Sequence, residues 1–108
     1  MAYLQNCIFL DSDSTVTTSE PLYVNSKAET LKLSVTGSGT LDVTVEGKIV
    51  SLAPSYYDIA SVKLDDYTVV SKITAEGIYA VDVQGIAQVR IVNGGSAGDV
   101  TVIGVVVG

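Results

Sequence analysis

Apolar and polar residues alternate along the last third of the chain, from Ile73 to Val107. Because successive side chains of a β-strand point to opposite faces, this pattern predicts three strands in a row, each with one apolar face. Between the first two strands, Gly85–Ala87 is short enough to form a three-residue hairpin loop. In that hairpin Asp82 would lie opposite Arg90, the chain's only arginine, on the outer face.

The segments Thr30–Thr36 and Thr40–Glu46 alternate in the same way. Gly37–Gly39 lies between them, and glycine readily supplies the positive φ angles that a tight reversal needs. The sequence therefore predicts a second antiparallel hairpin, with one face in the core and the other in water. Its predicted core positions are Leu31, Leu33, Val35, Leu41, Val43 and Val45.

Shorter apolar segments, separated by turn residues, make up the rest of the chain. Tyr3–Leu10 predicts an opening strand, and Asp11–Thr15 predicts a polar turn after it. Turn signals recur roughly every 8–12 residues, and β-branched residues outnumber helix formers. We therefore expect an all-β fold, an antiparallel β-sandwich of jelly-roll or immunoglobulin-like type, with residues 1–108 forming a single compact domain. Further short or edge strands are expected at Thr15–Ser19, Leu22–Asn25 and Tyr67–Ser71, and Gly47–Leu52 continues or restarts a strand. Tyr56–Ala60 and Ser61–Leu64 are expected to be strand or irregular coil, and Asp58–Leu64 could also form one helical turn.

The C-terminal strand becomes apolar on both faces in the run Val102–Gly108. Such a strand needs cover on both faces, and a two-layer sandwich covers only the inner one. We therefore expect the outer face to be covered by another subunit. The candidate interface residues on this strand are Ile103, Val105 and Val107.

Charge and composition exclude several classes of function. The net charge of −6 disfavours binding to DNA or RNA, which requires basic residues near the phosphates. The chain contains no His, which removes the commonest general base and the commonest metal ligand. A His-dependent catalytic triad and the usual zinc site are therefore excluded.

The N-terminal region and the single cysteine bear on location. Residues 1–14 lack the basic start and long apolar run of a signal peptide, and no stretch is long enough to span a bilayer. Cys7 cannot form an internal disulfide and is expected to be a small buried apolar residue. These features favour synthesis in a cytoplasm and predict no membrane partner.

Carboxylates are the main candidates for chemistry. A pair of them could act as the acid and base of a glycosidase, but most lie at polar strand positions or in turns, where a solvated surface is the ordinary role. Asp11, Asp13 and Thr15 have the spacing that starts a calcium loop, without its central Gly and terminal Glu. We therefore predict no catalytic, metal-binding or cofactor-binding residue, and no enzyme. The carboxylates considered are Asp42, Glu46, Asp58, Asp65, Asp66 and Asp82.

Tyr56 and Tyr57 are candidates for an interface, because tyrosine offers a large contact area at low entropic cost. In an extended chain the two rings must face opposite ways, so at least one could be exposed. For this pair an interface and a place in the core remain equally open.

Four segments together carry a resemblance to a known family. These are Gly39–Gly47, Ala75–Gly85 with the pattern Gly-x-Tyr-x-Val-Asp-Val-x-Gly, Val89–Ile91 with Val-Arg-Ile, and Ser96–Val102 with Gly-x-Val-Thr-Val. In this order they resemble small β-sandwich modules of tailed-bacteriophage virions, found in capsid decoration proteins, head fibres and tail-associated proteins. Related modules often carry a longer loop with a Trp after Glu-Gly, whereas here the chain runs straight on through Lys48.

The resemblance implies a virion structural protein without enzymatic activity, made in the cytoplasm of a bacterial host and incorporated into the particle. The preferred reading is a capsid decoration or cement protein that binds the major capsid protein, or another virion protein, as a homo-oligomer such as a trimer. The alternative is a receptor- or glycan-binding module of a tail or fibre, with Tyr56, Tyr57 and Asp58 as contacts. A small hydrolase is a third, less favoured possibility.

Overall fold

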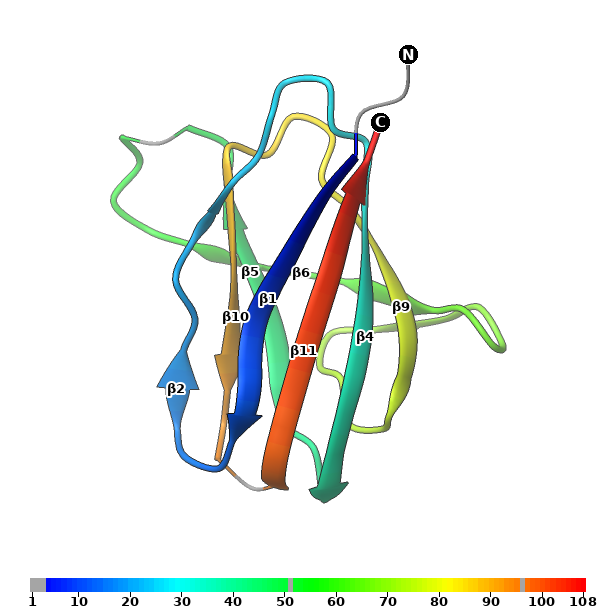
Figure 1. Cartoon of the computed structure of the whole chain (residues 1–108). Coiled ribbons are helices and arrows are strands. Elements are labelled where there is room, and N and C mark those ends of the chain that lie inside the picture. Colours follow the sequence, from blue (N-terminus) through cyan, green and yellow to red (C-terminus); the bar gives the residue numbers. More distant parts are fainter. Residues whose placement is uncertain (1–3, 51, 96) are drawn as a thin grey trace.

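The computed structural model describes residues 4–50, 52–95 and 97–108, and it consists of two antiparallel β-sheets packed face to face (Figure 1). The predicted all-β sandwich is confirmed. The six-stranded sheet contains, in spatial order, β1 (Leu4–Asp13), β11 (Ala97–Val107), β4 (Thr30–Gly39), β9 (Gly77–Asp82), β7 (Ser61–Lys63) and β8 (Thr68–Val70). The five-stranded sheet contains β2 (Thr17–Thr18) and β3 (Leu22–Tyr23), both paired with β10 (Gln88–Asn93), then β5 (Val43–Lys48) and β6 (Tyr57–Ile59).

Most successive strands cross from one sheet to the other. β1 lies in the six-stranded sheet, β2 and β3 in the five-stranded sheet, β4 in the first and β5 in the second; β9, β10 and β11 alternate likewise. The first and last strands therefore pair side by side, as Figure 1 shows. This strand order is that of a jelly roll, one of the two expected forms. No helix in the described ranges is long and apolar enough to cross a membrane.

The core lies between the two sheets and is formed by the residues that the alternation assigned to the inner faces. On the C-terminal strand, for example, Val100, Val102 and Val106 are completely buried. Each such side chain contributes about 1.5–3 kcal/mol by leaving water. The other buried inner-face residues include Leu31, Leu33, Val35, Leu41, Val43, Val45, Tyr79, Val81, Val83, Val89 and Ile91.

The predicted hairpin of Thr30–Thr36 with Thr40–Glu46 is wrong, although its two core faces are right. β4 does not turn at the glycines but continues to Gly39, and it pairs with β11 and β9. The chain then crosses to the other sheet, where β5 pairs with β10 and β6. Gly37 serves this crossing by its lack of a side chain, because a Cβ there would lie 2.8 Å from Leu41 Cδ2. The two apolar faces therefore meet across the core rather than within one sheet.

The predicted hairpin around Gly85–Ala87 is wrong for the same reason. β9 belongs to the six-stranded sheet and β10 to the five-stranded sheet, so Asp82 does not face Arg90. Gly85, with φ of 81°, helps the chain to cross between the layers. The arginine instead lies opposite Glu46 of β5.

The predicted turn at Asp11–Thr15 begins later than expected. β1 continues to Asp13 and carries register shifts on either side of Leu10, and Ser12 has a φ of 51°. Cys7, expected to be buried, is half-buried against the core, and this burial raises the pKa of its thiol above the usual value. The short edge strands β2 and β3 and the strands β6, β7 and β8 lie within segments where strands were expected.

Candidate assembly surface

The outer face of the six-stranded sheet is built from rows of side chains that run across its strands. In antiparallel sheets, directly paired residues share a face. The strand register therefore defines three rows, whose members come from up to six strands. The rows are Leu4, Val107, Thr30 and Asp82; then Asn6, Val105, Lys32, Ala80, Val62 and Val69; then Ile8, Ile103, Ser34 and Ile78.

Large aliphatic side chains on this outer face are open to solvent. Leu4 and Ile8 of β1 are 66% and 65% exposed, Ile103 of β11 is 45% exposed, and Ile78 of β9 is 48% exposed. Among the residues of the three rows, Lys32 and Asp82 carry the charges. Exposed aliphatic side chains that gather on one face are typical of an interaction surface.

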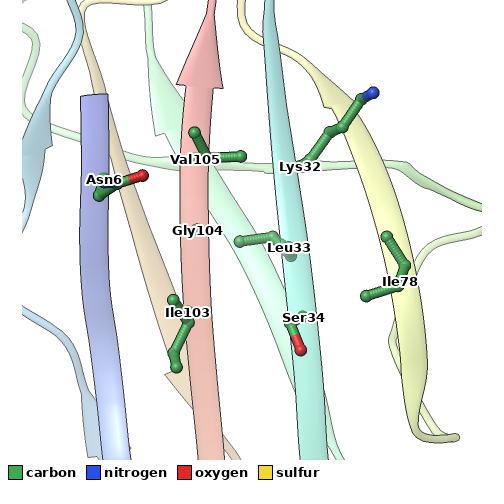
Figure 2. A pocket seen from close by; sticks show the side chains of 8 residues that line it. All are labelled: Asn6, Lys32, Leu33, Ser34, Ile78, Ile103, Gly104 and Val105. Carbon is green, nitrogen blue, oxygen red and sulfur yellow. The ribbon is translucent and has the colours of Figure 1, made fainter. Parts of the chain in front are cut away.

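A shallow hollow of about 290 Å³ lies on this face (Figure 2). In Figure 2 the side chains of Ile103 and Val105 lie on one side of it, on β11, and Ile78 lies on the other, on β9. Between them, on β4, are the small Ser34 and the long Lys32, whose amine points away from the hollow. The hollow can therefore receive an apolar side chain of a partner while the ammonium group stays in water.

The C-terminal strand is apolar on both faces, and the two faces have different surroundings in the structure. Its inner face is completely packed: a Cβ at Gly104 would lie 2.9 Å from both Leu31 Cδ1 and Phe9 Cε2. Its outer face presents Ile103, Val105 and Val107, the last two half-buried. The structure thus brings these three candidate residues together on one surface.

The outward side of the five-stranded sheet is, by contrast, polar and internally paired. Arg90 Nε donates to Glu46 Oε1 at 2.8 Å, and the guanidinium lies 3.8 Å from the centre of the Tyr56 ring. The Nζ of Lys48 lies 4.8 Å from the same centre, and the Tyr56 hydroxyl donates to Gln88 Oε1 at 2.7 Å. These groups satisfy one another, so this surface has less to gain from a partner than the apolar one.

Tyr56 and Tyr57 do not join the other candidate residues, because they lie at the five-stranded sheet. Tyr56 is half-buried in the cluster just described. Tyr57 is 72% exposed and lines a second apolar hollow, of about 220 Å³, together with Ile49, Ile59 and Ile86. The pair thus divides, with the Tyr56 ring held in the polar cluster and the Tyr57 ring exposed, and neither lies on the surface that carries Ile103, Val105 and Val107.

The sequence reasoning missed three residues of the apolar face: Leu4, Ile8 and Ile78. Each had a signal in the alternation. Leu4 and Ile8 are even-numbered positions of the uncharged segment Leu4–Leu10, and they alternate with residues that face the core. Ile78 precedes the buried Tyr79 and therefore points the other way. They were missed because an outward apolar residue indicates an interface only when other apolar residues share its surface, and only the order β1, β11, β4 and β9 places these three on the same face as Ile103.

The carboxylates considered for catalysis are dispersed. Glu46 and Asp58 are cross-strand neighbours on the open, outward side of the five-stranded sheet, and Glu46 is paired with Arg90. Asp42 pairs with Lys72 at 3.4 Å and Asp65 with Lys63 at 3.5 Å, while Asp82 Oδ1 accepts a hydrogen bond from the Gln84 backbone amide. Asp13, from the calcium-like spacing, is engaged by Asn93 and Thr17 instead.

Two solved structures share this fold. The SPBc2 prophage-derived protein YomS matches all of this chain and 96% of its own, with a TM-score of 0.87 and 20% identity. The PBSX exported protein XepA matches 99% of this chain with a TM-score of 0.89 and 24% identity, and this chain spans 38% of its length. At these identities the likeness establishes the fold. No protein-family model and no curated protein sequence matches the chain.

Proposed function

We propose that this chain is a structural protein of a tailed-bacteriophage particle, and that it decorates the capsid by docking on the shell through the outer face of its six-stranded sheet. The observation that carries the proposal is the contrast between the two outward surfaces. One is apolar and hollowed between Ile103 and Ile78, and the other is polar and internally paired. The prophage origin of the SPBc2 neighbour supports the phage setting.

The mechanism follows from burial of aliphatic surface at the joint between shell and decoration. Ile8, Ile78 and Ile103 lose water only when a complementary apolar partner is present, and this contributes about 25 cal/mol for each Å² removed from water. Because binding to the folded, assembled partner stabilises that state by mass action, decoration would raise the resistance of the shell to disassembly. The major capsid protein is the proposed partner, and a homo-oligomer the proposed binding form.

Co-sedimentation with undecorated capsids of the same phage tests this proposal. The wild-type chain should saturate at a fixed ratio to shell subunits. Ile103→Lys should weaken binding by about tenfold or more, since it buries a charge at the centre of the contact. Val92→Lys is the matched control, because Val92 lies on the outward side of the other sheet, beside Thr44. Absence of wild-type binding, or equal loss in both variants, would contradict the proposal.

A second candidate function, a receptor- or glycan-binding module of a tail or fibre, is favoured by the surface at Tyr57. This ring is exposed beside an apolar hollow, and Leu52, which precedes the lining residue Ala53 in the chain, is 97% exposed. Tyr56 supports this second function less, because its ring and hydroxyl already contact Arg90 and Gln88. Adherence of the purified chain to host cells, lost in Tyr57→Ala and retained in Ile103→Lys, is the result that this alternative predicts.

A further inference from the structure

The strands at the edges of the two sheets differ greatly in length. β2 and β3 have two residues each and are separated by Glu20 and Pro21, and β6 and β8 have three residues each. β1, at one edge of the six-stranded sheet, has ten residues and pairs along its length with β11 on one side. Among the described strands, β1 is therefore the long edge, with backbone groups directed away from the sheet.

The first half of β1 lacks the devices with which proteins usually protect an edge. Such devices are charges, prolines, bulges and short length. From Leu4 to Leu10 the sequence LQNCIFL contains no charge, Pro or Gly, and the register with β11 is regular from Leu4 to Ile8. The bulges come only after Ile8, towards Asp13. The regular, uncharged segment can thus accept another strand, and the bulged segment cannot.

We propose that the partner of this edge is a second copy of the chain, paired antiparallel with β1 about a two-fold axis at Asn6. In this register Leu4 of each copy lies opposite Ile8 of the other copy, and the two Asn6 residues lie opposite each other at the axis. All three side chains belong to the exposed outer face. Apolar contacts therefore flank a central pair of amides that can hydrogen-bond to each other, so the segment is complementary to itself.

The electrostatics of the joint permit this pairing in spite of the net charge of −6 on each copy. No charged residue lies within the paired segment Leu4–Ile8, and Asp11 and Asp13 come after the first register shift, between Ile8 and Leu10. Repulsion between the copies is therefore spread over distant surfaces and is weakened by salt. The pairing would join the two apolar outer faces into one continuous surface. It does not depend on the proposed capsid function, and it predicts a dimer where the sequence resemblance suggested a trimer.

Cysteine cross-linking tests the geometry directly. In a background with Cys7→Ala, Asn6→Cys should form a disulfide-linked dimer under mild oxidation, because directly opposed residues have Cα atoms about 4.5–5.5 Å apart, within disulfide reach. The control is Ser34→Cys on β4, two strands away from the edge. With strands about 4.8 Å apart, its two copies would be at least about 24 Å from each other and should not cross-link. Non-reducing electrophoresis reports the yield.

A second variant keeps the pairing testable if Asn6→Cys does not fold. Asn6→Lys places two ammonium groups together at the axis and should shift the concentration-dependent dimer seen by analytical ultracentrifugation to monomer. Thr36→Lys, on the same face but away from the edge, should leave the dimer intact. Equal cross-linking of Ser34→Cys would show that the sheets stack by their faces, and a wild-type monomer at all concentrations would overturn the pairing. Capsid binding by Ile103→Lys is scored separately, so the two proposals can fail independently.

Discussion

Arg90 pairs with Glu46, its direct cross-strand neighbour, with Nε 2.8 Å from Oε1, although Asp82 is far closer along the chain. The guanidinium also lies over the ring of Tyr56. The choice of partner follows from the topology. β10 and β5 are neighbours in the five-stranded sheet, whereas β9, which ends at Asp82, belongs to the six-stranded sheet.

Replacing Arg90 by Ala should lower the free energy of unfolding by about 1–2 kcal/mol, from the lost ion pair and the lost contact with the Tyr56 ring. Asp82→Asn is the control, since it removes the carboxylate charge but keeps an acceptor for the Gln84 amide. It should change stability by less than about 0.5 kcal/mol. Urea denaturation measures both, and a larger loss in Asp82→Asn would contradict the observed pairing.

Removing the Tyr56 hydroxyl should also be measurable. Tyr56→Phe keeps the ring under Arg90 but deletes the hydrogen bond to Gln88, and we expect a loss of about 0.5–1.5 kcal/mol. Tyr57→Phe, at the exposed neighbour, should be neutral. If the two variants melted alike by circular dichroism, Tyr56 would not hold the position described.

Gly104→Ala should destabilise the fold by about 1–3 kcal/mol through overpacking, because the added methyl group would meet Leu31, Phe9 and Leu33 in the core. Ser34→Ala, on the outer face of the next strand, should cost little. Chemical denaturation of both variants would check this, and a neutral Gly104→Ala would mean that the core at this point is looser than the structure shows.

Stability at low pH should depend on the buried Asn93. Its amide donates to Asp13 Oδ2 at 2.7 Å, and this hydrogen bond is the main cause of a pKa of Asp13 below its ordinary value of about 3.9. A carboxyl with a lowered folded-state pKa stabilises the fold above its unfolded-state pKa, and this contribution is lost as the pH falls through the folded-state pKa.

Asn93→Ala should lower the urea midpoint at neutral pH, since it removes the hydrogen bonds of the buried amide to Asp13 Oδ2, Thr15 O and Gly95 N. It should also flatten the part of the pH dependence that lies at and below about pH 4. Urea midpoints between pH 2 and pH 7 would test this. Asp66, whose pKa is lowered by its hydrogen bonds to Thr68, is present in the wild type and in the variant. An unchanged pH profile of stability in Asn93→Ala would therefore assign the pH dependence to other groups, such as Asp66.

The sequence by itself determined the fold class and the direction of most side chains. Alternation alone assigned Leu31, Leu33 and Val35 to the core, and it separated the outward Ile103 and Val105 from the inward Val102 and Val106. These assignments succeed because the two-residue period is a local property of an extended chain. Burial of the apolar face then follows from the hydrophobic effect, whichever strand happens to be the neighbour.

Only the tertiary structure decided which strands pair. The strand pairing in turn decided which residues form the candidate assembly surface. An inward apolar face can meet a neighbour in its own sheet or a face across the core, and alternation is the same in both cases. Both predicted hairpins were therefore wrong at glycines that allow a crossing as easily as a reversal. For the same reason Ile8, Ile78 and Ile103, distant in sequence, became one apolar surface only through the order β1, β11, β4 and β9.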